Sequence, residues 1–120
     1  MHRLKSALVA LVPTATLLLS PPTMAAGMSE EIGHLLDFVA ASPCAFIRNG
    51  VTYAGAQAAG HIKDKYEYYR SDIHSAEDFI ALAASKSMMS GRPYLVQCDT
   101  TTMPAADWLT KELAAFRQQP

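Results

Sequence analysis

CAFIRNGVTY, residues 44–53, is the stretch that decides the fold of this chain. At its centre, Asn49-Gly50 is a strong hairpin signal, because a two-residue turn needs a positive φ at both positions and these residue types tolerate one best. Apolar and β-branched residues flank the turn on both sides. We therefore predict a strand from Cys44 to Arg48, paired antiparallel with a strand from Val51 to Tyr53.

The chain has two cysteines, and each lies at one end of a predicted strand. Cys44 begins the first strand, and Cys98 ends a third strand predicted from Tyr94 to Cys98. A disulfide between them is easiest if these two strands run antiparallel and side by side. The predicted sheet therefore has three antiparallel strands in the order 2-1-3. The alternative is a reactive or metal-binding pair, but neither cysteine has a C-x-x-C spacing.

Four segments carry apolar residues at helical spacing, and helices are expected there. They run from an N-cap at Ser29 to about Ala41, from about Gly55 to Arg70, from Ser75 toward a C′ position at Gly91, and from about Pro104 to Phe116. The polar run Thr100–Thr102 is expected to be a connection. The resulting order, α-β-β-α-α-β-α, predicts a small α+β domain with helices packed on the sheet.

The first 26 residues have the pattern of a secretory signal peptide. Arg3 and Lys5 form a positive region, Ala7 to Leu19 is apolar, and small residues follow at Ala25 and Ala26. The apolar run is too short to span a bilayer comfortably. We therefore predict a signal peptide over 1–26 and one exported domain over 27–120, periplasmic or extracellular, with no stable membrane insertion after cleavage.

The charge balance argues against some classes of partner. The whole chain has a net charge of −1, and removal of the two basic residues of the signal peptide would make it more acidic. Nucleic-acid binders carry a basic excess on one face, so no nucleic-acid partner is expected. The histidines His34, His61 and His74 are scattered without a ligand spacing, so no metal and no cofactor are expected either.

Three residues are candidates for a binding site. Arg48 lies at the shoulder of the predicted hairpin, where a guanidinium can hold a carboxylate or phosphate with two hydrogen bonds. His61 and Lys65 are one helical turn apart on the next helix. A short connection from hairpin to helix would bring the three side chains toward one acidic or hydrogen-bonding ligand. The alternative is that all three are solvated or structural residues.

The remaining polar residues give weaker evidence for a function than Arg48, His61 and Lys65 do. Ser85, Ser87 and Ser90 follow the third helix, but no G-x-S-x-G or S-x-x-K pattern surrounds them, so no catalytic residue is assigned. Serines at the end of a helix usually donate hydrogen bonds to its last carbonyl groups.

Three tyrosines share the second predicted helix and cannot all face one way, so at least one ring is expected to be partly exposed. They are Tyr66, Tyr68 and Tyr69.

Several segments together resemble the YfeK-like family of small exported bacterial proteins of unknown function. The resembling segments are Phe46–Gly50, Ala58–Ile62 with Lys65, Ser75–Ile80, Ala84–Ser87 and Ser90–Tyr94. Ala54 and Gly60 depart from the family pattern. Its cysteine positions also vary, which implies a disulfide specific to this branch. The resemblance implies an exported location and supplies no activity, ligand or catalytic residue.

These observations favour a disulfide-bonded α+β domain that acts by binding. The expected partner is an envelope protein or a small anionic ligand. The alternative is a small hydrolase or transferase that uses Arg48, His61 and Lys65. A third interpretation is a stability or assembly factor whose exposed tyrosines contact another protein.

Overall fold

The computed structural model describes residues 26–120 and, further toward the N-terminus, Pro13 alone. The predicted signal peptide therefore lies outside the described residues, except for Pro13 and Ala26. None of the helices in the described part of the chain is both long enough and apolar enough to cross a membrane. The elements, in chain order, are α1 (Met28–Ala41), β1 (Ala45–Arg48), β2 (Val51–Tyr53), α2 (Gly55–Tyr68), a 3-10 turn η1 (Arg70–Asp72), α3 (Ala76–Ala83), β3 (Leu95–Cys98), β4 (Thr101–Pro104) and α4 (Ala105–Arg117).

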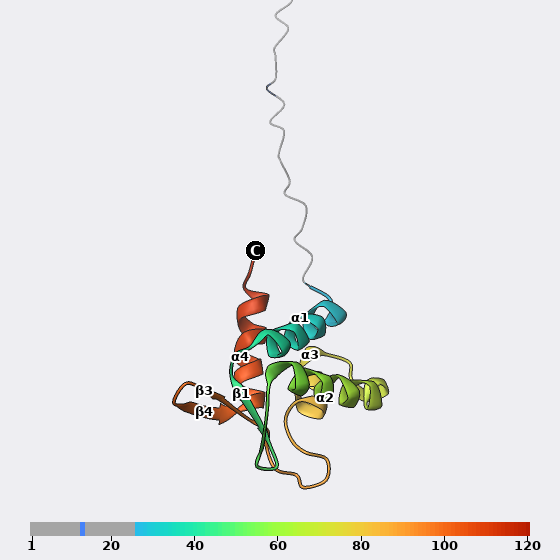
Figure 1. Ribbon diagram of the computed structural model, residues 1–120. Helices are drawn as coiled ribbons and strands as arrows, with labels where there is room; N and C mark the ends of the chain where they lie inside the picture. Colours follow the sequence, from blue (N-terminus) through green and yellow to red (C-terminus); the bar gives the residue numbers. More distant parts are fainter. Residues whose placement is uncertain (1–12, 14–25) are drawn as a thin grey trace, which may run out of the picture.

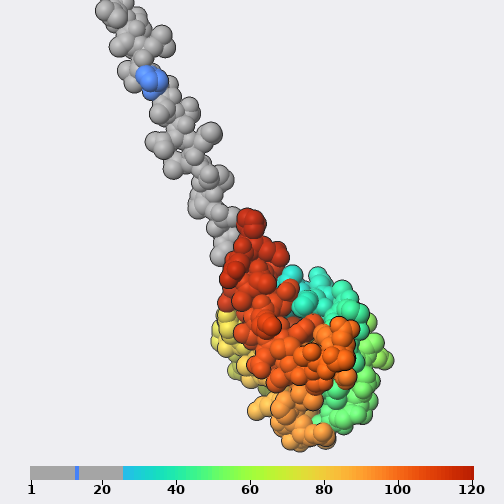
Figure 2. All heavy atoms as spheres, turned by 90° about the vertical axis from the view of Figure 1, so that its left-hand side faces the viewer, coloured from blue at the N-terminus to red at the C-terminus, as the bar shows by residue number. Residues whose placement is uncertain are grey.

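The sheet formed by the described residues has four antiparallel strands in the order β2-β1-β3-β4 (Figure 1). The prediction of a three-stranded sheet is therefore wrong. The residues expected to form a polar connection turn back at Asp99, whose φ is 54°, and Thr101 then pairs with Cys98. The fourth strand is a polar edge strand at the surface of the molecule (Figure 2), and it carries little apolar signal in the sequence.

The hairpin between β1 and β2 is confirmed. Asn49 has a φ of 51° and Gly50 a φ of 78°, as a two-residue turn of this kind requires. Arg48 pairs with Val51 across the turn. Asparagine is one of the few non-glycine residue types that adopt this backbone conformation readily.

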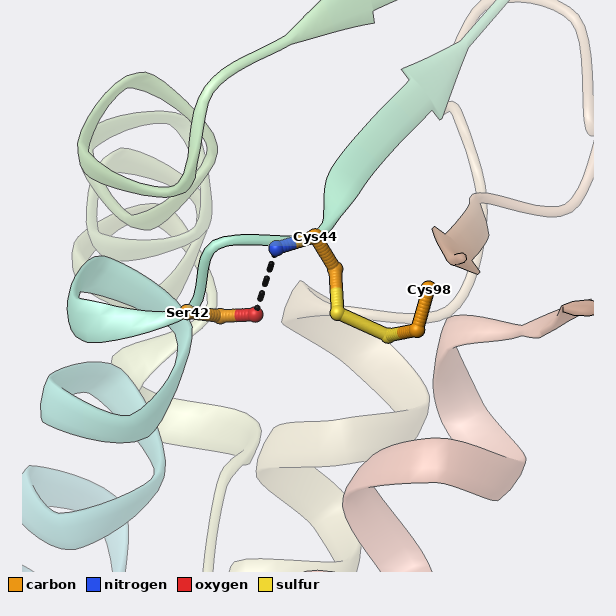
Figure 3. The surroundings of a disulfide bond; sticks show 3 residues. All are labelled: Ser42, Cys44 and Cys98. Atoms are coloured by element: carbon orange, nitrogen blue, oxygen red, sulfur yellow. Dashed lines mark hydrogen bonds between the residues drawn. A yellow bond between two sulfur atoms is a disulfide. The ribbon is translucent and has the colours of Figure 1, made fainter. Parts of the chain in front are cut away.

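The disulfide between Cys44 and Cys98 is also present (Figure 3). Because Ala45 pairs with Gln97 in the antiparallel register of β1 and β3, the two cysteines lie opposite each other. Their Cα atoms are 4.7 Å apart, within the range that a disulfide spans without backbone movement. The backbone N–H of Cys44 donates to Ser42 Oγ at 3.1 Å. The bridge therefore joins the start of β1 to the end of β3.

The core lies between one face of the sheet and the helices. Alternate residues of the strands form a row across the sheet, because Phe46 is opposite both Tyr53 and Val96, and Val96 is opposite Met103. This row packs with the buried faces of the helices. The helix residues in this core include Ile32, Leu35, Val39, Ile62, Phe79, Leu109 and Leu113.

Two helix ends differ from the sequence predictions. The N-cap of α1 is Gly27 instead of Ser29, so the helix begins one residue before the predicted cap. Helix α3 ends at Ala83, and Gly91, with a φ of 72°, lies in the following loop instead of at a C′ position. The predicted cap of α3 is confirmed, because Ser75 Oγ accepts from the backbone N–H of Asp78 at 3.0 Å.

Candidate anion-binding cleft

The strand alternation that builds the core also places two polar side chains on the helix side of the sheet. Arg48 is two residues after the core residue Phe46, and Tyr94 is two residues before the core residue Val96. Successive side chains of a strand point to opposite faces, so residues two apart share a face. Both polar residues therefore lie at one end of the sheet, beside α2.

The structure brings the three predicted site residues to one cleft of about 330 Å³. Arg48 comes from the end of β1, and His61 and Lys65 come from successive turns of α2. Only Ala54 separates β2 from α2, so the helix begins directly after the hairpin. The complete lining is Arg48, His61, Asp64, Lys65, Met88, Met89 and Tyr94. The convergence is a geometric fact, and the binding role stays a prediction.

Lys65 is held at the side of the cleft by two hydrogen bonds. Its Nζ donates to the Tyr94 hydroxyl at 3.1 Å and to the carbonyl of Lys86. Burial lowers the pKa of Lys65 below 10.5, and the positive charges of Arg48 and Lys86 lower it further. An ammonium has three N–H donors, so one is left for a ligand. Among residues 26–120, no carboxylate forms an ion pair with the Lys65 ammonium.

Arg48 lines the same cleft with its hydrogen-bonding capacity unused by the described residues. Its Nε is buried and has no hydrogen-bond partner there, and the guanidinium forms no ion pair with any described carboxylate. Buried polar groups are almost always hydrogen-bonded in native proteins. Arg48 can therefore turn toward a ligand without breaking a hydrogen bond to the described part of the chain.

Tyr94 forms the third polar contact of the cleft. Burial raises the pKa of Tyr94 above 10.0, an effect that the charge of Arg48 opposes and that Tyr69 reinforces. The neutral hydroxyl accepts a hydrogen bond from Lys65, so its own proton is available to a ligand oxygen. The cleft thus presents N–H and O–H donors from three side chains.

His61 and Asp64 lie on the exposed side of the cleft. The imidazole of His61 meets the ring of Tyr53 edge to face, with the ring centroids 5.0 Å apart. Asp64 is the one carboxylate among the described residues that line the cleft, and it forms no ion pair with them. The cleft therefore has an excess of positive charge from Arg48 and Lys65.

The loop of residues 84–94, here called the 84–94 loop, forms the rim. Figure 1 shows it beside the tip of the β1–β2 hairpin. Asn49 Nδ2 donates to Ser87 Oγ at 3.2 Å, and Ser90 Oγ donates to Asn49 Oδ1. Ser87 is only 1% exposed, whereas Asn49 is exposed, so this contact joins the buried part of the loop to the surface of the hairpin turn. Met88 and Met89, by contrast, are 52% and 93% exposed beside the cleft.

The other candidates from the sequence do not line the cleft. Ser85 Oγ donates to the carbonyl of Ala81 at 2.8 Å, as expected for a serine at a helix end. His34 Nε2 lies 3.0 Å from Glu112 Oε2 and its ring stacks on Phe116. Within the described residues, no group of three or more histidines, cysteines or carboxylates is placed to hold a metal ion. Tyr68 is the exposed tyrosine of α2, at 71%.

Sequence reasoning missed four lining residues: Asp64, Met88, Met89 and Tyr94. Tyr94 had a usable signal, because its separation from Val96 places both on one face of a strand. Asp64 could have been found from its position three residues after His61 on the predicted helix. The two methionines had no such signal, because they lie in an irregular loop.

The comparisons with known proteins identify a family and no activity. No curated protein and no solved structure matches the chain. A model of a family of unknown function, DUF5329, matches residues 26–117, which is nearly all of the described chain. The match does not test the resemblance to YfeK-like proteins. The chain therefore belongs to the DUF5329 family of unknown function.

Proposed function

We propose that this protein is an exported binding domain that captures a small anion in the cleft between α2, the β1–β2 hairpin and the 84–94 loop. The observation that carries the proposal is the convergence of Arg48 and Lys65 in one cleft, where no described carboxylate pairs with either. Buried or partly buried charges are normally paired in proteins. An anionic ligand would supply the missing partner.

The electrostatics of the cleft favour an anionic ligand. Burial and the nearby charges of Arg48 and Lys86 disfavour the protonated form of Lys65, and a bound anion would reverse that effect. The donors available to the ligand are the guanidinium, the remaining ammonium N–H and the Tyr94 hydroxyl. Such charge-assisted hydrogen bonds are stronger than bonds between neutral groups.

Binding is favoured over catalysis by the composition of the cleft. The described residues that line it include no serine, threonine or cysteine. A hydroxyl nucleophile of serine or threonine, or a cysteine thiol, beside a positioned base is therefore absent from the described lining. The hydrolase or transferase that uses Arg48, His61 and Lys65 would need a lysine, histidine or carboxylate as its nucleophile, and only the convergence of these residues in one cleft speaks for it.

Export is supported by the signal-peptide pattern, by the disulfide and by the resemblance to YfeK-like proteins. Disulfides persist mainly in oxidising compartments. The intact mass of the protein from the envelope fraction tests this part of the proposal. We expect cleavage after Ala25 or Ala26, and an uncleaved chain in the cytoplasm would contradict export.

Titration calorimetry with acetate and with phosphate at low ionic strength tests the anion site. Hydrogen bonds to charged groups contribute about 1.5–3 kcal/mol, so Arg48→Ala should weaken binding about 10- to 100-fold. Lys63→Ala is the matched control, because Lys63 is an exposed cation of α2 that does not line the cleft. Equal losses in the two variants, or no binding of either anion, would contradict the proposal. Thermal unfolding of each variant shows whether the domain is intact.

A further inference from the structure

An apolar crevice lies directly behind the cleft. Its volume is about 30 Å³, and its walls come from α1, β1, β2, α2 and α4, with Tyr94 before β3. The core side chains in these walls include Phe46, Ala58, Ile62 and Leu109. No carboxylate is among the described residues that line it. The crevice therefore offers an alkyl group a hydrophobic environment. Beyond Arg48 and His61, which line the crevice where it meets the cleft, it offers no charged partner to an acidic or basic substituent of the ligand.

The crevice and the cleft share three side chains. Arg48, His61 and Tyr94 line both spaces, so the two adjoin at the polar end of the sheet. A ligand with a carboxylate at Arg48 and Lys65 would have its other end beside the crevice. Phosphate and sulfate have no apolar end to place there. The polar and apolar spaces together therefore match an amphiphilic anion better than an inorganic one.

The size of the crevice limits the length of the apolar end. A water molecule needs about 10–15 Å³ of cavity volume on this measure, and a methylene group is of similar size. A crevice of about 30 Å³ thus has room for about two or three carbon atoms. A longer chain would reach the close-packed core at Leu109, which cannot move aside without strain.

We propose that the ligand is a short-chain aliphatic carboxylate, with its carboxylate at Arg48 and Lys65 and its alkyl chain in the crevice. This inference rests on the proposed function and specifies the ligand class of the same site. Butyrate has the expected length, because three carbons follow its carboxylate. Acetate uses the polar contacts almost alone.

Calorimetric titrations with acetate, propionate, butyrate, hexanoate and phosphate test the inference. Burial of one CH₂ group corresponds to about a fourfold gain in affinity, so butyrate should bind about 10- to 15-fold more tightly than acetate. Hexanoate should bind no more tightly than butyrate, because the crevice is full. Equal affinities for acetate, butyrate and phosphate would overturn the carboxylate inference and leave the anion site standing. Absence of binding by all five would overturn both.

A substitution in the crevice separates the alkyl contact from the carboxylate contact. Ala58→Val adds two methyl groups to the crevice wall, so it should remove the gain from acetate to butyrate and leave acetate affinity unchanged. Ala56→Val is the matched control, because Ala56 is exposed on the same helix and lines neither space. If the first variant is unfolded, Ile62→Val tests the same point by enlarging the crevice, and the preferred chain should become one carbon longer. The inference would be overturned if Ala58→Val kept the gain in affinity from acetate to butyrate, or if it lost acetate and butyrate binding equally. An unchanged chain-length preference in Ile62→Val would overturn it as well.

Discussion

Removal of the Cys44–Cys98 disulfide should cost a large part of the stability of this domain. The bridge closes a loop with a sequence separation of 54 residues. In the chain-entropy model, closure of a loop of that size destabilises the unfolded state by about 4 kcal/mol. Small domains have a free energy of unfolding of about 5–15 kcal/mol in total, so the double variant Cys44→Ala, Cys98→Ala should lose between about a quarter and about four fifths of that free energy.

Urea unfolding of the oxidised protein, the reduced protein and the double variant measures this effect. For a slope of about 2 kcal/mol per molar urea, the midpoint should fall by about 2 M on reduction. The reduced protein keeps both cysteine side chains, so its loss reports the closed loop without a change in packing. The double variant should not respond to reductant. A loss below about 1 kcal/mol in the reduced protein would refute the reasoning, because it would show that the bridge restricts the unfolded chain little.

Three further predictions follow from the local geometry. Gly55→Ala would place a Cβ atom against the backbone carbonyl of Val39 in α1 and should destabilise the domain by about 1–3 kcal/mol. Gly60→Ala, with open space around it, should stabilise α2 by about 0.5–1 kcal/mol in thermal unfolding. Asn49→Gly keeps the positive φ of the turn but removes the hydrogen-bond partner of the buried Ser87 hydroxyl. Limited proteolysis should therefore cut the 84–94 loop faster, while the hairpin itself is little destabilised. An unchanged cleavage rate would contradict the anchoring role of Asn49. Butyrate affinity should begin to fall at a pH below 10.5, because the pKa of Lys65 in the free protein is lowered and its deprotonation removes a positive charge from the cleft. Lys65→Arg, which stays protonated, should extend binding to higher pH, and identical pH profiles would contradict the role of Lys65.

The parts of the fold that depend on local sequence signals were predictable. Asn49-Gly50 predicted the hairpin, and the two cysteines then predicted which strand pairs with β1. The fourth strand was missed because it depends on a positive φ at Asp99, a residue type for which that conformation is optional. Its threonines are also exposed, so no alternation of apolar residues marks it as a strand.

The part of the candidate site that comes from elements adjacent in the sequence was predictable, and the part that comes from distant segments was not. Arg48, His61 and Lys65 converge because α2 begins directly after the hairpin. The rim could not be predicted, because the 84–94 loop is placed by the bond between Asn49 and Ser87, residues 38 positions apart. Contacts of that kind follow from the tertiary fold and leave no periodic pattern in the sequence.

The central claim, that the cleft beside Arg48 binds an anion, is tested most directly by mapping butyrate binding on the protein by NMR. The full-length gene product, purified as the cell processes it, is titrated with butyrate at neutral pH while its backbone amide shifts are followed. We expect saturable shifts around Arg48, Lys65 and Tyr94, none around Gln97 on the other face of β3, and loss of the shifts in Arg48→Ala. Shifts that are absent with butyrate and also in a parallel titration with phosphate, that cluster away from the cleft, or that persist unchanged in Arg48→Ala would contradict the claim.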